Sequence, residues 1–201
     1  MSGSQGVPDA VPDWAREPGA HAIEILRAVD VDGVVQQGWQ VVSGNFSCDR
    51  SSRGLVPSIS AVEAGTVECS SITAAVARNC WPDESGHNAL CLQDPFSRTL
   101  TRIPSPHQLT GQPPEADARV IGIELANGQK CRTVFGGAGS VLREGGQSFN
   151  SRFACPDGVV YEGHQPGGFS SDGSGLTATY STDGTSADQV GVVTLYFLGT
   201  A

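Results

Sequence analysis

The sequence predicts a mainly β fold: antiparallel sheets, sandwich- or barrel-like, with one short N-terminal helix and disulfides that staple the strands. Among 201 residues there are 26 Gly and 12 Pro but only 16% charged residues, a composition that favours short strands joined by turns. Apolar and polar residues alternate over short stretches bounded by turn signals. The six cysteines are an even number, as a disulfide framework requires.

The N-terminal region predicts a flexible leader over residues 1–18, because its prolines come without apolar periodicity. A single β-rich domain is expected over residues 19–201. Apolar residues between positions 22 and 29 recur at helical spacing after a proline, which predicts a short amphipathic helix over about residues 19–29.

Turn dipeptides between apolar runs predict hairpins. Asp32-Gly33 lies between two such runs, and Asp94-Pro95 separates the two strand-like halves of ALCLQDPFSRTLTRI. Asn127-Gly128, within VIGIELANGQKCRTVF, suits the tight primed turns of hairpins. Pro156-Asp157-Gly158 repeats the pattern.

Three other stretches complete the expected organisation. The proline-rich segment 104–118 has no periodicity and is expected to be a long surface loop. SSITAAVARNC fits either a strand or a helix around residues 74–77. The apolar segment 190–198 predicts a terminal strand that is central or buried.

The cysteines lack the C-x-x-C spacing that zinc sites and thioredoxin-like centres need. Three disulfides are the economical interpretation, although six cysteines allow fifteen pairings. The favoured pairing joins neighbours along the chain: Cys48 with Cys69, Cys80 with Cys91, and Cys131 with Cys155. The last two pairs each close a predicted strand–turn–strand unit, whose facing Cα atoms would lie about 4.5–5.5 Å apart.

Disulfides place the protein outside the cytoplasm, either secreted or in a cell envelope. The N-terminus lacks the basic and apolar segments of a signal peptide. A Met followed by Ser-Gly-Ser is typical of an engineered start, so we expect a signal or anchor to have been removed. The net charge of −9 argues against nucleic-acid partners, and no apolar run is long enough for an integral membrane protein.

No catalytic or metal motif is present: neither G-x-S-x-G nor H-E-x-x-H occurs. We therefore expect no cofactor. Calcium is the one candidate, because Asp30-x-Asp32-Gly33 and the stretch 172–188 place carboxylates beside glycines, although turn chemistry explains both. The glycines at 136–139 lack the lysine and helix of a phosphate cradle and favour a bulge or close packing.

Aromatic residues offer a carbohydrate- or peptide-binding face, although Trp39 and Trp81 are more typical of a core. Three residues in predicted loops are the candidates for ligand contact. Trp81 lies at the mouth of a predicted hairpin, His87 lies in its tip, and Phe169 lies in PGGFSSDG.

The segments CW, ALCLQDPFSRTLTR, IELANGQKCR, FGGAG, FACPDG and VVTLYFLGTA resemble, in this order, a group of uncharacterised exported or anchored proteins of mycobacteria and related actinobacteria. The likeness covers about Cys48 to Ala201. It implies an extracytoplasmic, disulfide-containing β domain of the cell envelope, and it brings no catalytic residue to this chain.

These observations predict an extracytoplasmic binding or structural module of the bacterial cell envelope, non-enzymatic, whose partner is an envelope component or a protein. One alternative is a secreted hydrolase whose loops bring His87, His107 or His164 to nearby carboxylates. Another is an accessory subunit of an envelope complex, which would show an exposed apolar patch.

Overall fold

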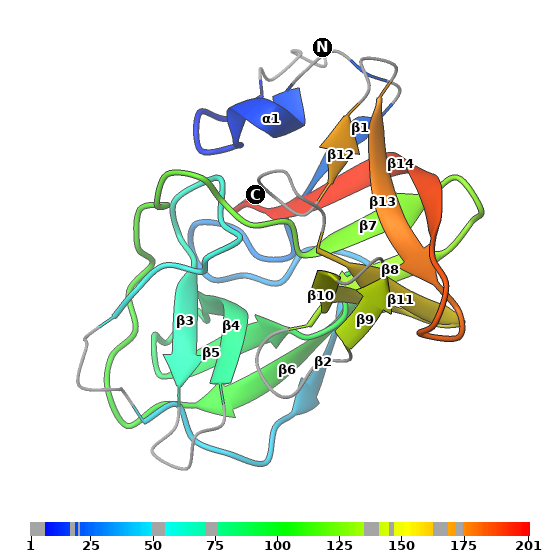
Figure 1. The fold of residues 1–201 in the computed structure, drawn as a ribbon. Helices are drawn as coiled ribbons and strands as arrows, with labels where there is room; N and C mark the ends of the chain where they lie inside the picture. Colours follow the sequence, from blue (N-terminus) through cyan, green and yellow to red (C-terminus); the bar gives the residue numbers. More distant parts are fainter. Residues whose placement is uncertain are drawn as a thin grey trace. The chain divides into compact units, whose positions relative to one another are not determined.

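The computed structural model is mainly β, as expected from the sequence (Figure 1). It describes residues 7–16, 19, 21–49, 55–70, 76–134, 141–144, 147–162, 169–171 and 175–201. Its described elements are one helix, α1 (Asp13–Arg16), and fourteen strands in two sheets. The chain forms two compact units: unit 1 comprises Met1–Pro12, Ile25–Arg119 and Phe197–Ala201, and unit 2 comprises Asp13–Glu24 and Val120–Tyr196.

Unit 1 is built on a five-stranded sheet in the order β2-β6-β5-β4-β3 (Figure 1). Its strands are β2 (Gln40–Ser43), β3 (Val67–Ser70), β4 (Val76–Pro82), β5 (Asn88–Leu92) and β6 (Thr99–Pro104). The last four pair antiparallel, whereas β2 runs parallel to β6 at the edge. Parallel neighbours need a long connection, and here β3, β4 and β5 lie between the two in the chain.

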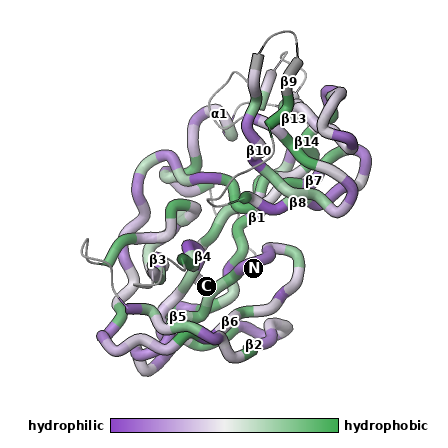
Figure 2. The backbone as a smooth tube through the Cα atoms, turned by 60° about the horizontal axis from the view of Figure 1, so that its bottom comes forward, coloured by the Kyte–Doolittle hydropathy of each residue, from purple (hydrophilic) through white to green (hydrophobic). Residues whose placement is uncertain are grey.

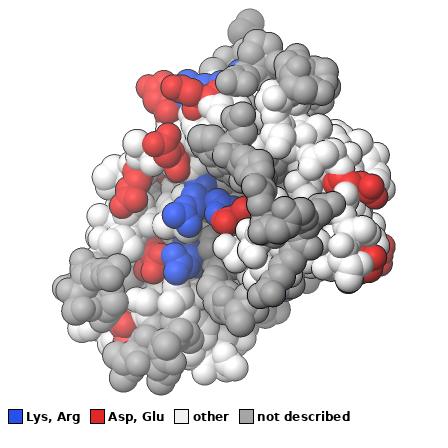
Figure 3. Space-filling model, viewed as in Figure 1, with Lys and Arg blue, Asp and Glu red and all other residues white. Residues whose placement is uncertain are grey.

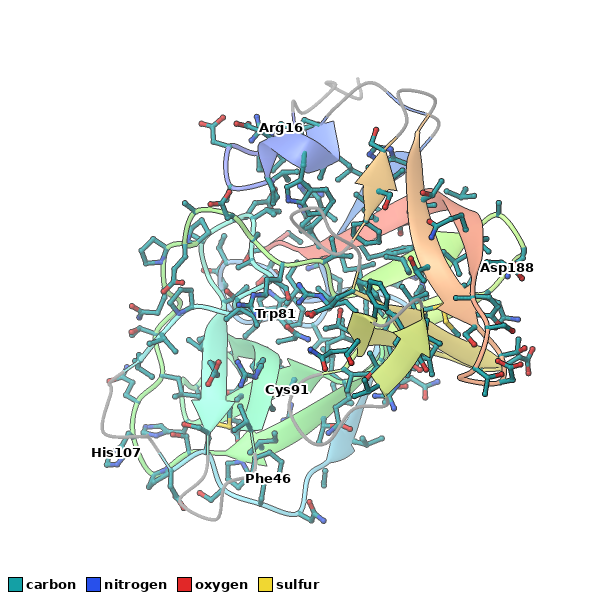
Figure 4. The ribbon with its side chains drawn as sticks, in the orientation of Figure 1. Arg16, Phe46, Trp81, Cys91, His107 and Asp188 are labelled. Carbon is teal, nitrogen blue, oxygen red and sulfur yellow. A yellow bond between two sulfur atoms is a disulfide. The ribbon has the colours of Figure 1, made fainter. Side chains whose placement is uncertain are left out.

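The five-stranded sheet is buried on both faces at its centre. Cys80 pairs with Cys91 across β4 and β5, and the next pair is Trp81 with Leu90. Because successive side chains point to opposite faces, the cysteines face one layer and Trp81 and Leu90 the other. The cysteine face holds a buried cluster that includes Val67 and Ile103, against which Phe46 packs (Figure 4).

Unit 2 contains most of a nine-stranded sheet. Its strands are β1 (Ala22–Leu26), β7 (Gly122–Leu125), β8 (Lys130–Thr133), β9 (Val141–Glu144), β10 (Gln147–Cys155), β11 (Gly158–Tyr161), β12 (Ser170–Ser171), β13 (Leu176–Ser181) and β14 (Asp188–Leu198). Six of them pair in the order β7-β8-β10-β11-β13-β14, and β14 pairs again with β7. The result is a closed antiparallel barrel, which leaves its ring without free edges.

The barrel interior is filled by alternate residues of these strands. Ile123, Phe153, Ala178 and Leu195 are at most 1% exposed. Apolar stretches of the chain are green and polar ones purple along the tube in Figure 2. The prediction of a central or buried terminal strand is confirmed, because β14 lies between β13 and β7.

The expected helix over residues 19–29 is wrong. Ala22–Leu26 is strand β1, with alternating exposure that ends at buried Leu26, and the one described helix is α1. The segment AIEIL fits a period of two as well as a helical one, and its β-branched isoleucines favour the strand once a neighbour is available. Within the expected leader, Val11 and Ala15 are each 1% exposed, while residues 1–6, 17 and 18 lie outside the described residues.

The predicted hairpin at Asp32-Gly33 is reduced to a single bridge between Val29 and Val35. The following strand, β2, pairs with β6 instead. This difference arises because register is decided by long-range pairing, which a local turn signal does not reveal.

The other predicted hairpins form. Strands β5 and β6 flank Asp94-Pro95, and β10 and β11 are joined by Pro156-Asp157, with Cys155 opposite Gly158. Segment 105–118 contains no strand, as expected for the long loop, and only Gln112 forms an isolated bridge. For SSITAAVARNC the strand interpretation holds from Val76, whereas residues 71–75 lie outside the described part.

The hairpin at Asn127-Gly128 forms with a different turn from the primed one expected. Leu125 N–H donates to Gln129 O and Gly128 N–H donates to Leu125 O. Gly128 has a φ of 83°, whereas Asn127 does not adopt positive φ. This is the pattern of a three-residue loop, in which one left-handed glycine after a type I turn restores the strand direction.

Candidate ligand-binding groove

Three disulfides form, and all three predicted pairs are confirmed: Cys48–Cys69, Cys80–Cys91 and Cys131–Cys155. Their Cα atoms lie 5.2, 4.0 and 4.1 Å apart, respectively, and the last two pairs join neighbouring strands. No free cysteine remains. A chain with all of its cysteines paired belongs in an oxidising environment.

Two of the residues expected to contact ligand are core residues instead. Trp81 is 1% exposed, and its Nε1–H donates to Gly199 O at 2.9 Å (Figure 4). Phe169 is also 1% exposed, with ring centroids 5.4 Å from Trp14 and 5.8 Å from Phe153. Both rings fold inward because burying an aromatic side chain removes a large apolar area from water, so neither presents a surface to a ligand.

The third candidate, His87, is exposed in the β4–β5 turn, where its backbone N–H donates to Ser85 Oγ. His107 is also exposed, in the long loop (Figure 4), and His164 lies outside the described residues. His21 Nε2 lies 2.9 Å from Ala15 O. Throughout the described ranges, no histidine side chain forms a hydrogen bond or ion pair with a carboxylate.

The carboxylates considered for calcium bind their own turns. Asp30 Oδ1 accepts hydrogen bonds from the N–H groups of Asp32 and Val34. Asp183 accepts from the N–H groups of Ser186 and Thr185, and these bonds hold the pKa of its carboxyl well below the usual range. No group of three or more potential metal ligands occurs in the part of the chain that is described. Asp172 and the glycines at 136–139 fall outside it.

A groove of about 720 Å³ lies on unit 1, and no motif in the sequence marks it. Its floor is the sheet face opposite the cysteines, since β2 residue Val41 pairs with Leu100, and β5 residue Leu90 pairs with Arg102. Val41, Leu90 and Arg102 line it, between a turn that ends at Trp39 and the turn after β4.

The first wall is the turn Gln36–Trp39. Gln36 N–H donates to Ala28 O at 2.9 Å, and Trp39 N–H donates to Gln36 O at 3.3 Å. Gly38 has a φ of 88°, which is the conformation that the third position of a type II turn requires. The turn therefore fixes Trp39, a half-buried side chain, at the head of β2 and beside the groove.

The second wall is the turn that begins at Asp83. The Asp83 carboxylate accepts hydrogen bonds from Ser85 Oγ at 2.7 Å and Asn88 Nδ2 at 2.8 Å. Burial favours a higher pKa for this carboxyl, but the hydrogen bonds from Ser85 and Asn88 and the nearby Arg102 charge outweigh it and lower the pKa. Asp83 is therefore ionised at neutral pH.

The segment that precedes the first wall touches the second wall at Gly33. A Cβ atom at this position would lie 2.4 Å from Glu84 N and 2.5 Å from Asp83 C, so only glycine allows the backbones to approach this closely. A second hollow, of about 260 Å³, lies beside the contact and shares Gly33, Asp83 and Glu84 with the groove. The walls are thus fixed to one another before any ligand arrives.

Several polar groups of the groove are available for a ligand. The side chains of Gln37, Glu84 and Arg102 form no hydrogen bond to any residue that the structure describes, and Trp39 Nε1 likewise has no such partner. Gln37, Glu84 and Arg102 are exposed. The groove therefore combines an aromatic ring and the exposed Val41 side chain with unused donors and acceptors, the usual composition of a small-molecule site.

Within the described residues, no helix has the length and apolar character needed to cross a membrane. Acidic side chains are scattered over the face drawn in Figure 3, while basic ones occupy small areas, in agreement with the net charge of −9. Comparison of the chain with protein-family models, with curated proteins and with solved structures finds no match.

Proposed function

We propose that this protein is a non-enzymatic, extracytoplasmic binding module of a bacterial cell envelope, and that it binds its ligand in the groove beside Trp39. The groove carries the proposal. Its lining combines Trp39 and Val41 with Gln37, Glu84 and Arg102, and hydrogen bonds within each wall hold its turn in place. A preformed site binds ligand without an ordering cost.

The compartment in the proposal rests on the disulfides. All six cysteines are paired, which supports an oxidising location. The actinobacterial envelope is proposed from the resemblance of the cysteine-bearing segments to exported proteins of that group.

The test is retention by the immobilised full chain. Cell-wall glycan, lipid and secreted-peptide fractions from an actinobacterium would be passed over it, and a parallel column would carry the Trp39→Ala variant. We expect one fraction to be retained by the wild type and lost with the variant. A panel of chromogenic ester, glycoside and peptide substrates would be assayed with the same protein, and turnover without any retained fraction would overturn the proposal.

A further inference from the structure

We infer that the ligand of the Trp39 groove is an uncharged glycan, one of whose sugar rings stacks on the Trp39 indole while its hydroxyls bond Gln37, Glu84 and Arg102. This inference rests on the proposed binding function and names its ligand class.

The hydrogen-bonding groups of the groove require a ligand that both donates and accepts. An ionised Glu84 only accepts, the Arg102 guanidinium only donates, and the Gln37 amide does both. All three side chains line the same groove. A sugar hydroxyl carries one donor and two acceptor positions. Neighbouring hydroxyls on one ring can therefore donate to Glu84, accept from Arg102 and do either with Gln37, so that no donor faces a donor and no acceptor faces an acceptor.

The charges of the groove disfavour anionic ligands. The lining of the groove holds two carboxylates, Asp83 and Glu84, and one guanidinium, Arg102. The chain as a whole has a net charge of −9. A polyanionic ligand would meet a negative field on approach, whereas a neutral ligand would not.

The aromatic ring supplies the apolar part of the contact. Trp39 is half-buried and fixed by the turn that Gly38 permits, while Val41, 37% exposed, extends the apolar surface along β2. A sugar ring presents its C–H groups on a face and its hydroxyls at the edge. It therefore fits a site in which one aromatic ring is flanked by polar side chains.

An extended peptide is the competing ligand. It would add to the exposed edge of β2, where Val42 is 47% exposed, and would bond the backbone rather than the groove side chains. Val42 pairs with Thr101 and so lies on the opposite face from Val41. Variants of the two faces therefore separate the two modes of binding.

The experiment is isothermal titration of the full, oxidised chain with soluble oligosaccharides. The probes are neutral β-linked and α-linked glucose oligomers, N-acetylglucosamine oligomers and mannose oligomers, with oligogalacturonate as the anionic probe and glucosamine oligomers as the cationic one. A set of extended peptides is the remaining probe. We expect at least one neutral oligomer to bind and the anionic sugar to fail.

The variants are chosen so that folding and binding can be told apart. Trp39→Ala should weaken binding of the neutral oligomer by at least about tenfold, and Trp39→Phe should restore part of it because a ring remains. Gln37→Ala alters an exposed turn side chain and should lower affinity without lowering the melting temperature. Val42→Ala, on the other face of β2, is the matched control and should bind as the wild type does.

The outcomes separate this inference from the proposed function. Peptides or charged sugars that bind in a Trp39-dependent manner, with no neutral oligomer bound, would overturn the glycan and leave the binding function standing. Failure of every probe and of every envelope fraction to bind in a Trp39-dependent manner would overturn both.

Discussion

At the scale of single residues, Gly158 is a position in unit 2 where the backbone leaves no room for a side chain. A Cβ atom there would lie 2.5 Å from Ser181 O and 2.8 Å from the Tyr180 ring. Since Gly158 is the first residue of β11 and faces Cys155, the barrel cannot accept a side chain at this position without moving β13.

We expect Gly158→Ala to lower the free energy of unfolding by about 1–3 kcal/mol, the usual cost of forcing extra atoms into a packed site. Gly191→Ala is the matched control, because its added Cβ would meet only Ala126 Cβ, at 3.6 Å. It should change stability by no more than about 0.5 kcal/mol. Urea denaturation of both variants measures the difference, and equal stabilities would contradict the clash.

Tyr196 gives the barrel a specific sensitivity to alkaline pH. Burial, followed by the charges of Glu24 and Glu124, raises the pKa of its hydroxyl to about 12, and the hydroxyl donates to Glu124 Oε2 at 3.3 Å. In the unfolded chain the phenol ionises near pH 10. The unfolded state therefore holds fewer protons than the folded state between about pH 10 and 12, and stability falls as pH rises through this range.

We expect Tyr196→Phe to remove part of this loss. Thermal melts of wild type and variant between pH 8 and 11.5 should show a shallower decline for the variant, with a residual decline from Tyr180, whose pKa is also raised, by burial and by Asp157. Parallel curves for the two proteins would show that Tyr196 does not titrate as the structure requires.

At the scale of elements, the β4–β5 turn depends on Asp83. Its carboxylate accepts hydrogen bonds from Ser85 Oγ and from Asn88 N and Nδ2. Its backbone carbonyl accepts a further bond from Gly86 N–H. One side chain thus organises the second wall of the candidate groove, and Gly33, which precedes the first wall in the chain, packs against it.

Asp83→Ala should lower the free energy of unfolding by about 1–3 kcal/mol at pH 7, because hydrogen bonds to an ionised group are lost and their donors are left unpaired. Because the folded-state pKa is lowered, this contribution is fully present above the unfolded value near 3.8 and is lost as pH falls through the lower folded value. Wild type and variant should therefore converge in acid. A difference that persists unchanged at pH 2 would contradict the role of the ionised carboxylate.

Local patterns in the sequence predict the hairpins well because turn residues and apolar alternation both lie within a few residues of each other. The Cys80–Cys91 and Cys131–Cys155 pairs follow from them. The strand at Ala22–Leu26 and the parallel pairing of β2 with β6 depend instead on distant partners, which a local pattern does not specify.

The groove escapes prediction for the same reason. Trp39, Asp83 and Arg102 are far apart in the chain, and only the pairing of β2, β6, β5 and β4 brings them to one sheet face. The sequence places Trp81 and Phe169 in predicted loops, which makes them candidates for ligand contact. Tertiary packing decides whether an aromatic ring points inward, however, and both side chains are 1% exposed.

At the scale of the whole molecule, each unit has its own covalent constraint. Cys48–Cys69 and Cys80–Cys91 join strands and loops of unit 1, and Cys131–Cys155 joins β8 to β10 in the barrel. The enclosed loops have sequence separations of 21, 11 and 24 residues. In the chain-entropy model, loops of this size each stabilise the fold by about 3 kcal/mol.

The combined contribution of the three disulfides is comparable with the whole free energy of unfolding of an ordinary domain, about 5–15 kcal/mol. Reduction should therefore unfold the protein at moderate temperature. Intact mass of the alkylated protein before and after reduction should first show six thiols only in the reduced sample. Circular dichroism melts of the two samples then measure how far reduction lowers the melting temperature. Replacing Cys131 and Cys155 together by alanine should destabilise unit 2, because the loop that they close is then unconstrained in the unfolded chain. Six titratable thiols in the untreated protein would contradict the disulfides and remove the support for the proposed extracytoplasmic location.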